Sequence, residues 1–142
     1  ELINFEAERR GIKDAINARS GSRLLYFSGQ GGIGKTRLLQ EAEILARKGR
    51  GIRWGGVVDL YHSHLHDISQ IVRKVVNDLD PDNVYFKDTE QVVNEFESEK
   101  NAGVKGKALS MRRDAVYESF LQEYEAFSKK YRVVLAFDTL ET

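Results

Sequence analysis

The sequence predicts an α/β protein in which helices cover a parallel sheet. Three apolar runs have the length and composition of buried strands, at residues 24–28, 52–60 and 132–137. Segments with apolar residues at helical spacing lie before and between them, so helices and strands alternate along the chain. This alternation is typical of a parallel sheet with both faces covered.

Composition limits the function classes. The 142 residues suit one domain or a part of one. Basic and acidic residues number 22 each, and this zero formal net charge disfavours a protein that coats nucleic acid. The absence of cysteine excludes disulfides and thiolate chemistry and fits the cytoplasm, where we expect the protein. No apolar run reaches the roughly 20 residues that cross a bilayer, so no membrane contact is expected.

The first helix is expected over residues 6–18 and the first strand over residues 24–28. The second helix, at residues 35–48, ends where Gly49 and Gly51 interrupt the pattern. Each helix has one apolar face. These faces consist of Ala7, Ile12, Ala15 and Ile16 in the first helix, and of Leu38, Leu39, Ala42, Leu45 and Ala46 in the second.

The second strand, at residues 52–60, contains Gly55 and Gly56, which weaken the strand pattern. Asp67 is expected to cap the next helix, at residues 68–78, and a proline soon after it stops that helix. The residues of this helix that are expected to point inward are Ile71, Val72, Val75, Val76 and Leu79.

Two further helices precede the last strand, at residues 132–137. The first is expected to open at Asp88 or Thr89 and to reach about Lys100, and the second to cover residues 109–130 after a glycine-containing break. We expect the second helix to pack its apolar face against the sheet. That face consists of Val116, Tyr117, Phe120, Leu121, Tyr124 and Phe127.

The segment Gly29-Gln-Gly-Gly-Ile-Gly-Lys-Thr36 fits two binding motifs. As Gly-x-Gly-x-x-Gly it is a dinucleotide fingerprint, and as Gly-x-x-x-x-Gly-Lys-Thr it is a phosphate loop, the Walker A motif. A dinucleotide site needs no lysine or threonine here. It needs an acid about 20 residues further on, and Asp59 lies later in the sequence than that position. A plain glycine turn is the third interpretation. Lys35 and Thr36, placed between a strand and a helix, favour the phosphate loop.

Each residue type in this segment suits a triphosphate. Glycines let successive backbone N–H groups point at the phosphates, and the helix that starts at Lys35 adds the positive end of its dipole. Lys35 supplies a cation for the β- and γ-phosphates, and the Thr36 hydroxyl suits Mg²⁺. The predicted nucleotide-binding residues are Gly29, Gly31, Gly32, Ile33, Gly34, Lys35, Thr36 and Arg37.

The segment Arg132-Val-Val-Leu-Ala-Phe-Asp138 is an apolar strand that ends in an acid. The Walker B segment of P-loop enzymes has this layout and places an aspartate next to Mg²⁺. An ordinary buried strand with an aspartate at its exit is the alternative. In combination with the phosphate loop, the pattern favours Asp138 as the magnesium-side acid, together with Thr36.

The chain resembles the STAND class of signal-transduction ATPases, which are P-loop NTPases related to the AAA+ proteins. The phosphate loop "GQGGIGKTRLLQE", the lead-in "INFEAERRGIKDAI" and the segment "VVLAFDTLE" carry the resemblance. It implies a three-layer αβα fold with a parallel sheet and an ATP-driven switch inside a larger regulatory protein. It also implies ATP or ADP and Mg²⁺ as ligands, homo-oligomers through the nucleotide domain, and contacts with the remaining domains of the same protein.

The resemblance also assigns roles to single residues. Those that it places at the phosphates and magnesium are Gly29, Gly34, Lys35, Thr36 and Asp138, and it places Ile3 to Phe5 near the adenine. Many active relatives carry an acid directly after the magnesium-side aspartate, whereas this chain has Thr139. Glu141 is the candidate substitute, so Lys35, Asp138 and Glu141 are the expected catalytic residues. Slow hydrolysis is expected, as suits a switch.

We expect the chain to be the N-terminal part of one P-loop nucleotide-binding domain. In the folds that it resembles, a later strand lies between the phosphate-loop strand and the Asp138 strand, and the sequence stops at Thr142, before that strand. The start at Glu1 rather than Met also suggests a piece of a longer protein. The expected parts are a lead-in helix at 1–22, the phosphate-loop unit at 23–60, a helical segment at 61–131 and the second nucleotide motif at 132–142.

Two groups of polar residues have both a functional and an ordinary interpretation. His62, His64 and His66 alternate, so they suit a metal together with Asp67, but loop and capping roles are favoured because a strand ends and a helix begins here. Basic residues around the glycine-containing break suit nucleic acid, but a solvated surface is favoured because the overall charge is balanced. These basic residues are Lys100, Lys105, Lys107, Arg112 and Arg113.

Two other functions compete with the ATP switch. A small-molecule P-loop kinase would hold its phosphate acceptor after the second strand, in the histidine-containing segment 61–67. A non-enzymatic scaffold would use nucleotide only for structure, or not at all, and Thr139 keeps this alternative open. The sequence favours a Mg-ATP-binding switch with slow hydrolysis.

Overall fold

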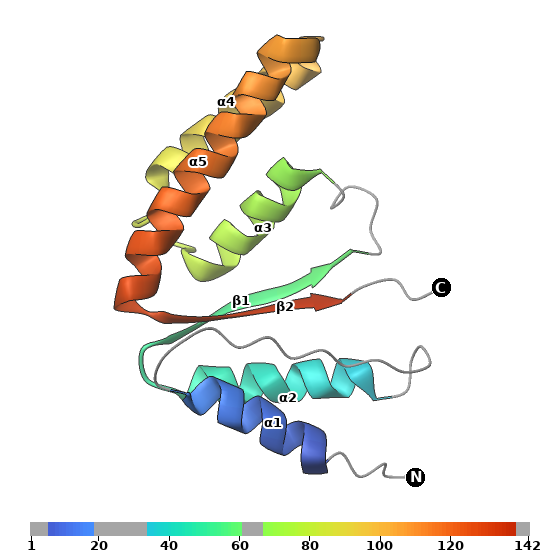
Figure 1. Ribbon diagram of the computed structural model, residues 1–142, viewed down its shortest axis with the longest axis vertical. Coiled ribbons are helices and arrows are strands. Elements are labelled where there is room, and N and C mark those ends of the chain that lie inside the picture. Colours follow the sequence, from blue (N-terminus) through green and yellow to red (C-terminus); the bar gives the residue numbers. More distant parts are fainter. Residues whose placement is uncertain (1–5, 19–33, 61–66, 139–142) are drawn as a thin grey trace.

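The computed structural model describes residues 6–18, 34–60 and 67–138, which form five helices and two strands. Their bounds are α1 Glu6–Asn17, α2 Lys35–Lys48, β1 Ile52–Asp59, α3 Ile68–Leu79, α4 Lys87–Asn101, α5 Gly106–Lys130 and β2 Arg132–Asp138. The strands pair in parallel, with α1 and α2 on one side and α3 and the α4–α5 hairpin on the other (Figure 1). The predicted α/β class with a parallel sheet is confirmed for the described residues.

β1 and β2 are direct neighbours, and one irregularity interrupts their register. Trp54 pairs with Val134 and Val57 pairs with Ala136, so β1 has one residue more than β2 between these two pairs. The extra residue forms a bulge at the predicted glycine pair, where Gly56 has a φ of 75°, in the left-handed region that favours glycine. The glycines therefore bend the strand without ending it.

Two hydrophobic clusters lie on opposite faces of the sheet. The cluster on the α1–α2 face buries Ile12, Ile16, Leu38, Ala46, Trp54 and Ala136. The cluster on the α3–α5 face buries Val58, Val72, Val75, Val76, Leu79, Phe86, Val93, Phe96, Val116 and Phe127. Of the residues of α3 predicted to point inward, four are buried, and Ile71 packs partly buried against the cluster.

Helix α3 is capped as predicted. One carboxylate oxygen of Asp67 accepts hydrogen bonds from the backbone N–H of Ser69 at 3.1 Å and from its hydroxyl at 3.2 Å. The other oxygen pairs with the Lys100 ammonium at the end of α4. Burial acts to raise the pKa of Asp67, but the bonds from Lys100 and Ser69 outweigh it and hold that pKa below the usual 3.8.

The start of α4 corrects a prediction. The helix begins at Lys87, and neither Asp88 nor Thr89 caps it with its own side chain. Glu123 of α5 supplies the cap. Its carboxylate accepts the Thr89 N–H at 2.7 Å, the Thr89 hydroxyl at 2.6 Å and the Asp88 N–H at 3.3 Å. The residue at the N-cap position is Phe86, whose side chain has no hydrogen-bond acceptor.

The packing of α5 corrects a second prediction. The helix starts at Gly106 rather than at residue 109, and it lies along α4, with only its C-terminal end near the sheet (Figure 1). Tyr117 and Leu121, which were expected to face the sheet, are 42% and 63% exposed. The reason is that one neighbouring helix covers a narrower stripe than a sheet does, so the flank of the apolar face remains outside.

A buried carboxylate organises the loop between α3 and α4. Asp80 is 5% exposed and follows α3 directly. One of its oxygens accepts the N–H of Val84 at 2.9 Å, and the other accepts those of Tyr85 at 2.8 Å and Phe86 at 2.9 Å. These bonds turn the chain back so that Phe86 enters the larger hydrophobic cluster.

Candidate functional site

The described part of the predicted phosphate loop is the start of α2. Gly34 precedes the helix with a φ of 74°, again in the left-handed region. The Leu38 N–H returns to the Gly34 carbonyl at 2.9 Å, so the helix is regular from its first turn. The first N–H groups of a helix have no acceptor inside it, and Gly34 has no side chain that could supply one. This geometry suits an anion at the positive end of the helix dipole.

The carboxyl ends of both strands lie at the same end of the molecule as this helix start. Figure 1 shows the arrowheads of β1 and β2 and the beginning of α2 together on one side. Asp59 and Asp138 are the last residues of their strands and stand opposite each other in register. The Leu60 N–H donates to the Asp138 carbonyl at 2.9 Å, so the two strands remain hydrogen-bonded to each other up to this edge. Ligands of α/β proteins bind outside the carboxyl ends of the strands.

Both carboxylates point to the face that α2 covers. Successive side chains of a strand alternate between the two faces. In β1, Val57 packs against the α1–α2 cluster and Val58 lies in the other one, so Asp59 returns to the α2 face. In β2, Ala136 lies in the α1–α2 cluster, and Asp138, two residues later, shares its face.

The structure brings the described site residues to one edge and one face. These are Gly34, Lys35, Thr36, Arg37 and Asp138. Lys35 and Asp138 are partly buried, and Thr36 and Arg37 are exposed. The other predicted site residues lie outside the described part of the chain, as does the lead-in at residues 3–5. They are Gly29, Gly31, Gly32, Ile33 and Glu141.

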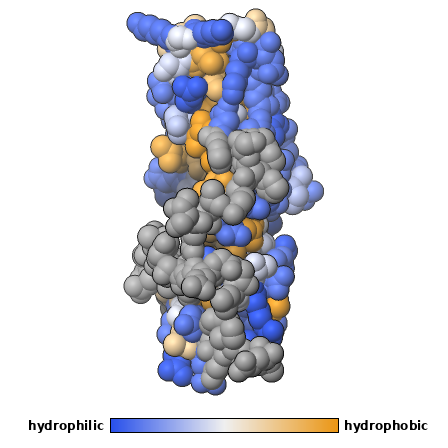
Figure 2. All heavy atoms as spheres, turned by 90° about the vertical axis from the view of Figure 1, so that its right-hand side faces the viewer, coloured by the Kyte–Doolittle hydropathy of each residue, from blue (hydrophilic) through white to orange (hydrophobic). Residues whose placement is uncertain are grey.

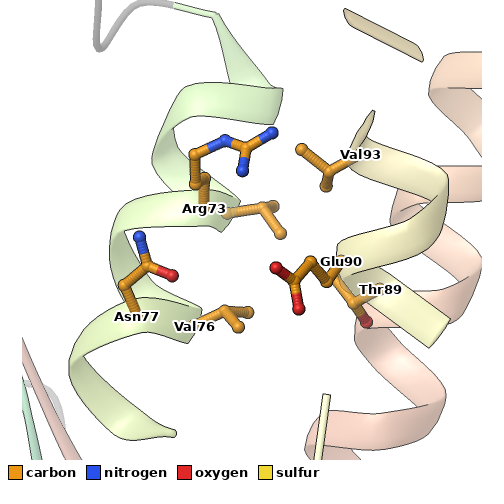
Figure 3. A pocket seen from close by; sticks show the side chains of 7 residues that line it. Arg73, Val76, Asn77, Thr89, Glu90 and Val93 are labelled. Carbon is orange, nitrogen blue, oxygen red and sulfur yellow. The ribbon is translucent and has the colours of Figure 1, made fainter. Parts of the chain in front are cut away.

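Two pockets among the described residues lie away from this edge. Figure 3 shows the first, between α3 and α4, where Arg73, Asn77 and Glu90 surround a space of about 10 Å³, enough for one water molecule. The second has about 200 Å³ and lies at the far end of α2, where Lys13 and Lys48 line it. The first is too small for a nucleotide, and the second is at the wrong end of the helix for the phosphate loop.

Most of the basic residues around the glycine-containing break have partners within the protein. Lys100 pairs with Asp67, and Arg112 pairs with Glu95 at 3.3 Å and Glu99 at 2.9 Å. The Arg113 guanidinium lies 5.5 Å from the centre of the Phe96 ring. Lys105 and Lys107 are exposed in and after the turn. The contacts of Arg112 and Arg113 join α5 to α4, and the contact of Lys100 joins the end of α4 to the start of α3.

A charged network lies at the amino ends of the strands, opposite the candidate site. The hydroxyls of Tyr85 and Tyr131 are 3.0 Å apart, and the Arg53 guanidinium lies 4.3 Å from the centre of the Tyr131 ring. The hydrogen bonds with Tyr85 and Arg53 lower the pKa of Tyr131, and the contact with Tyr85 raises the pKa of Lys130. The network joins the starts of α4 and β2 to β1.

Sequence reasoning weighed Asp59 only as the ribose-binding acid of a dinucleotide site. The structure places it beside Asp138, the residue predicted to lie at magnesium. The signal available in the sequence was the layout that both segments share, an apolar strand that ends in aspartate. What the sequence did not contain was the pairing of these two strands.

Three further findings concern metal ligands, membrane spans and similarity to known proteins. His62, His64 and His66 lie outside the described residues, and in the described part no three or more His, Asp or Glu side chains are grouped so that they could hold a metal ion. No helix within residues 6–18, 34–60 and 67–138 has the length and hydrophobicity of a membrane span. No protein-family model, curated protein or solved structure matches the chain.

Proposed function

We propose that the chain binds a magnesium–nucleoside triphosphate at the edge formed by the start of α2 and the carboxyl ends of β1 and β2. ATP is the expected nucleotide. The observation that carries the proposal is that the helix start Gly34-Lys35-Thr36 and the acid Asp138 share one end and one face of a parallel sheet. A triphosphate needs a cation and backbone N–H groups, and its magnesium needs oxygen ligands.

Each described residue then has a role that its chemistry suits. The Lys35 ammonium neutralises charge on the β- and γ-phosphates, and the N–H groups of the first turn of α2 face the phosphates. The Thr36 hydroxyl and the Asp138 carboxylate are oxygen ligands of the type that Mg²⁺ prefers, directly or through water. The bound metal would neutralise the charge that develops on the transferred phosphoryl group.

The finer fold assignment belongs to the same proposal. We infer a three-layer P-loop NTPase fold in which β1 and β2 are two strands of a larger parallel sheet. Two facts support this: helices cover both faces of the sheet, and α2 connects a glycine-rich segment to β1. A STAND-type ATPase would use nucleotide binding to switch its arrangement or its oligomeric state, with slow hydrolysis resetting it.

Titration calorimetry with Mg-ATP tests the proposal directly. The wild type is expected to bind Mg-ATP, and Lys35→Ala to bind it at least tenfold more weakly, because the triphosphate loses its cation. Lys48→Ala is the matched control, since it removes an exposed lysine from the far end of the same helix. Equal affinity of Lys35→Ala and the wild type, or no binding by the wild type, refutes the proposal. Fluorescence of Trp54, the single tryptophan, verifies that each variant folds.

The same preparation separates the competing functions. Incubation with labelled ATP and candidate small-molecule acceptors shows where the γ-phosphate goes. A switch ATPase releases it slowly as inorganic phosphate, whereas a kinase transfers it to an acceptor. A scaffold releases none and shows no change in molecular size when ATP is added.

A further inference from the structure

We propose that Asp59 holds the attacking water and accepts its proton during hydrolysis of the triphosphate bound at this edge. The inference rests on the proposed function and adds to it the residue that activates the water. Neither the phosphate loop nor Asp138 supplies such a group, because Lys35 and Thr36 serve the phosphates and magnesium.

The first argument is position. Asp59 and Asp138 are directly opposite each other on neighbouring parallel strands, whose backbones are about 4.8 Å apart. Alternation directs both side chains to the α2 face. A carboxylate one strand away from the magnesium-side acid can therefore reach a water beside the γ-phosphate without binding the metal itself.

The second argument is chemical need. The residue after Asp138 is Thr139, and a hydroxyl is a poor proton acceptor near neutral pH. A carboxylate does this work in many hydrolases and typically accelerates them by 10²–10⁴-fold. The next acid in the sequence, Asp67, caps α3 and pairs with Lys100. Asp59 thus combines the required group with the required edge and face.

The reaction balances without a further reactant. The water oxygen forms a bond to the γ-phosphorus while the bond between that phosphorus and the bridging oxygen of the diphosphate breaks. The Asp59 carboxylate takes one proton from the water and later returns it to solvent. The products are the nucleoside diphosphate and inorganic phosphate.

The test compares Asp59→Asn with the wild type in two measurements on the same preparation. Calorimetry gives the affinity for Mg-ATP, and a single-turnover assay with protein in excess gives the rate of phosphate release. We expect Asp59→Asn to keep its affinity within threefold and to release phosphate at least 100-fold more slowly. Asp82→Asn, an exposed aspartate in the loop after α3, is the control and keeps both values.

A second readout does not depend on turnover. Protein incubated with ATP and then passed through a desalting column carries the nucleotide that it holds, which mass spectrometry identifies. We expect the wild type to carry mainly the diphosphate and Asp59→Asn mainly the triphosphate.

The outcomes separate this inference from the proposed function. If the wild type does not bind Mg-ATP, the proposed function itself fails. If the wild type binds ATP but releases no phosphate, or if Asp59→Asn hydrolyses at the wild-type rate, only the role of Asp59 is refuted. Glu141→Gln tests the competing assignment. Loss of hydrolysis in that variant, with hydrolysis by Asp59→Asn unaffected, assigns activation of the water to Glu141.

Discussion

Glu123 of α5 caps helix α4 at Thr89, across 34 residues of sequence. The carboxylate accepts both the backbone N–H and the hydroxyl of Thr89, and Thr89 is buried. A helix cap normally comes from the residue just before the helix, which satisfies an otherwise unpaired N–H group. Here the cap also fixes the two helices of the hairpin relative to each other.

Removal of this cap should destabilise the protein. Glu123→Ala leaves the buried donors of Thr89 without an acceptor, and we expect the free energy of unfolding to fall by about 2 kcal/mol. Glu123→Gln keeps one acceptor oxygen, so the loss should be smaller. Urea denaturation followed by far-ultraviolet circular dichroism measures both.

The control is Glu125→Ala on the same helix. That carboxylate is exposed and pairs with Lys129 at 3.7 Å. Its removal should cost about 0.5 kcal/mol or less. Equal effects of Glu123→Ala and Glu125→Ala would show that the bond between α5 and the start of α4 contributes nothing.

Asp80 gives a second stability prediction. Asp80→Ala removes the acceptor of three N–H groups in the loop before α4, and we expect a loss of about 3 kcal/mol. Asp80→Asn keeps one of the two acceptor oxygens and should lose about half as much. Chemical denaturation of both variants, with Asp82→Asn as the exposed control in the same loop, checks the order. A loss below 1 kcal/mol for Asp80→Ala would contradict it.

Asp67 makes stability depend on pH in the acidic range. Its pKa in the folded protein lies below 3.8, so the folded state favours the ionised carboxylate more than the unfolded state does. The resulting stabilisation is fully present above about pH 5 and disappears as the pH falls through the folded pKa. Denaturation midpoints of the wild type and Asp67→Asn should therefore converge between roughly pH 5 and pH 2. A difference that stays constant over this range would contradict the prediction.

Two glycines should respond to alanine in opposite directions. At Gly34 the left-handed conformation is unfavourable for alanine, and we expect a loss of about 1–2 kcal/mol, together with weaker Mg-ATP binding. At Gly11, inside α1, an added Cβ meets nothing within 4 Å, and alanine should stabilise the helix by about 0.5–1 kcal/mol. Thermal and urea denaturation measure both signs, and stabilisation by Gly34→Ala would count against the conformation described for it.

Local signals predicted the elements that local chemistry decides. The bounds of α2 agree to the residue, because a glycine precedes it and another follows it. Asp67 caps α3 as expected, since an N-cap lies next to the N–H group that it satisfies. The start of α4 was predicted one or two residues late, and the acceptor that caps this helix, Glu123, comes from another helix. The predicted packing of α5 was wrong because an apolar stripe on a helix does not specify whether a sheet or another helix covers it.

The sequence likewise predicts one part of the candidate site and not the other. The motif predicts the chemistry of Lys35 and Thr36, and the apolar run predicts that Asp138 ends a strand. Nothing in either strand specifies that Asp59 stands opposite Asp138, because strand pairing is decided by the whole sheet. Confirmation of the motif itself depends on nucleotide binding.

The bulge in β1 decides which side of the sheet receives the last carboxylate of that strand. Counted from Trp54, a regular strand would turn Asp59 toward α3, and the one additional residue reverses this assignment. If the same sequence ran through this interval without the bulge, Asp59 would lie on the side away from α2, while the composition of charged and apolar residues would stay the same. The chemistry available at this edge thus depends on a backbone bulge at Gly56, a residue that carries no functional group of its own.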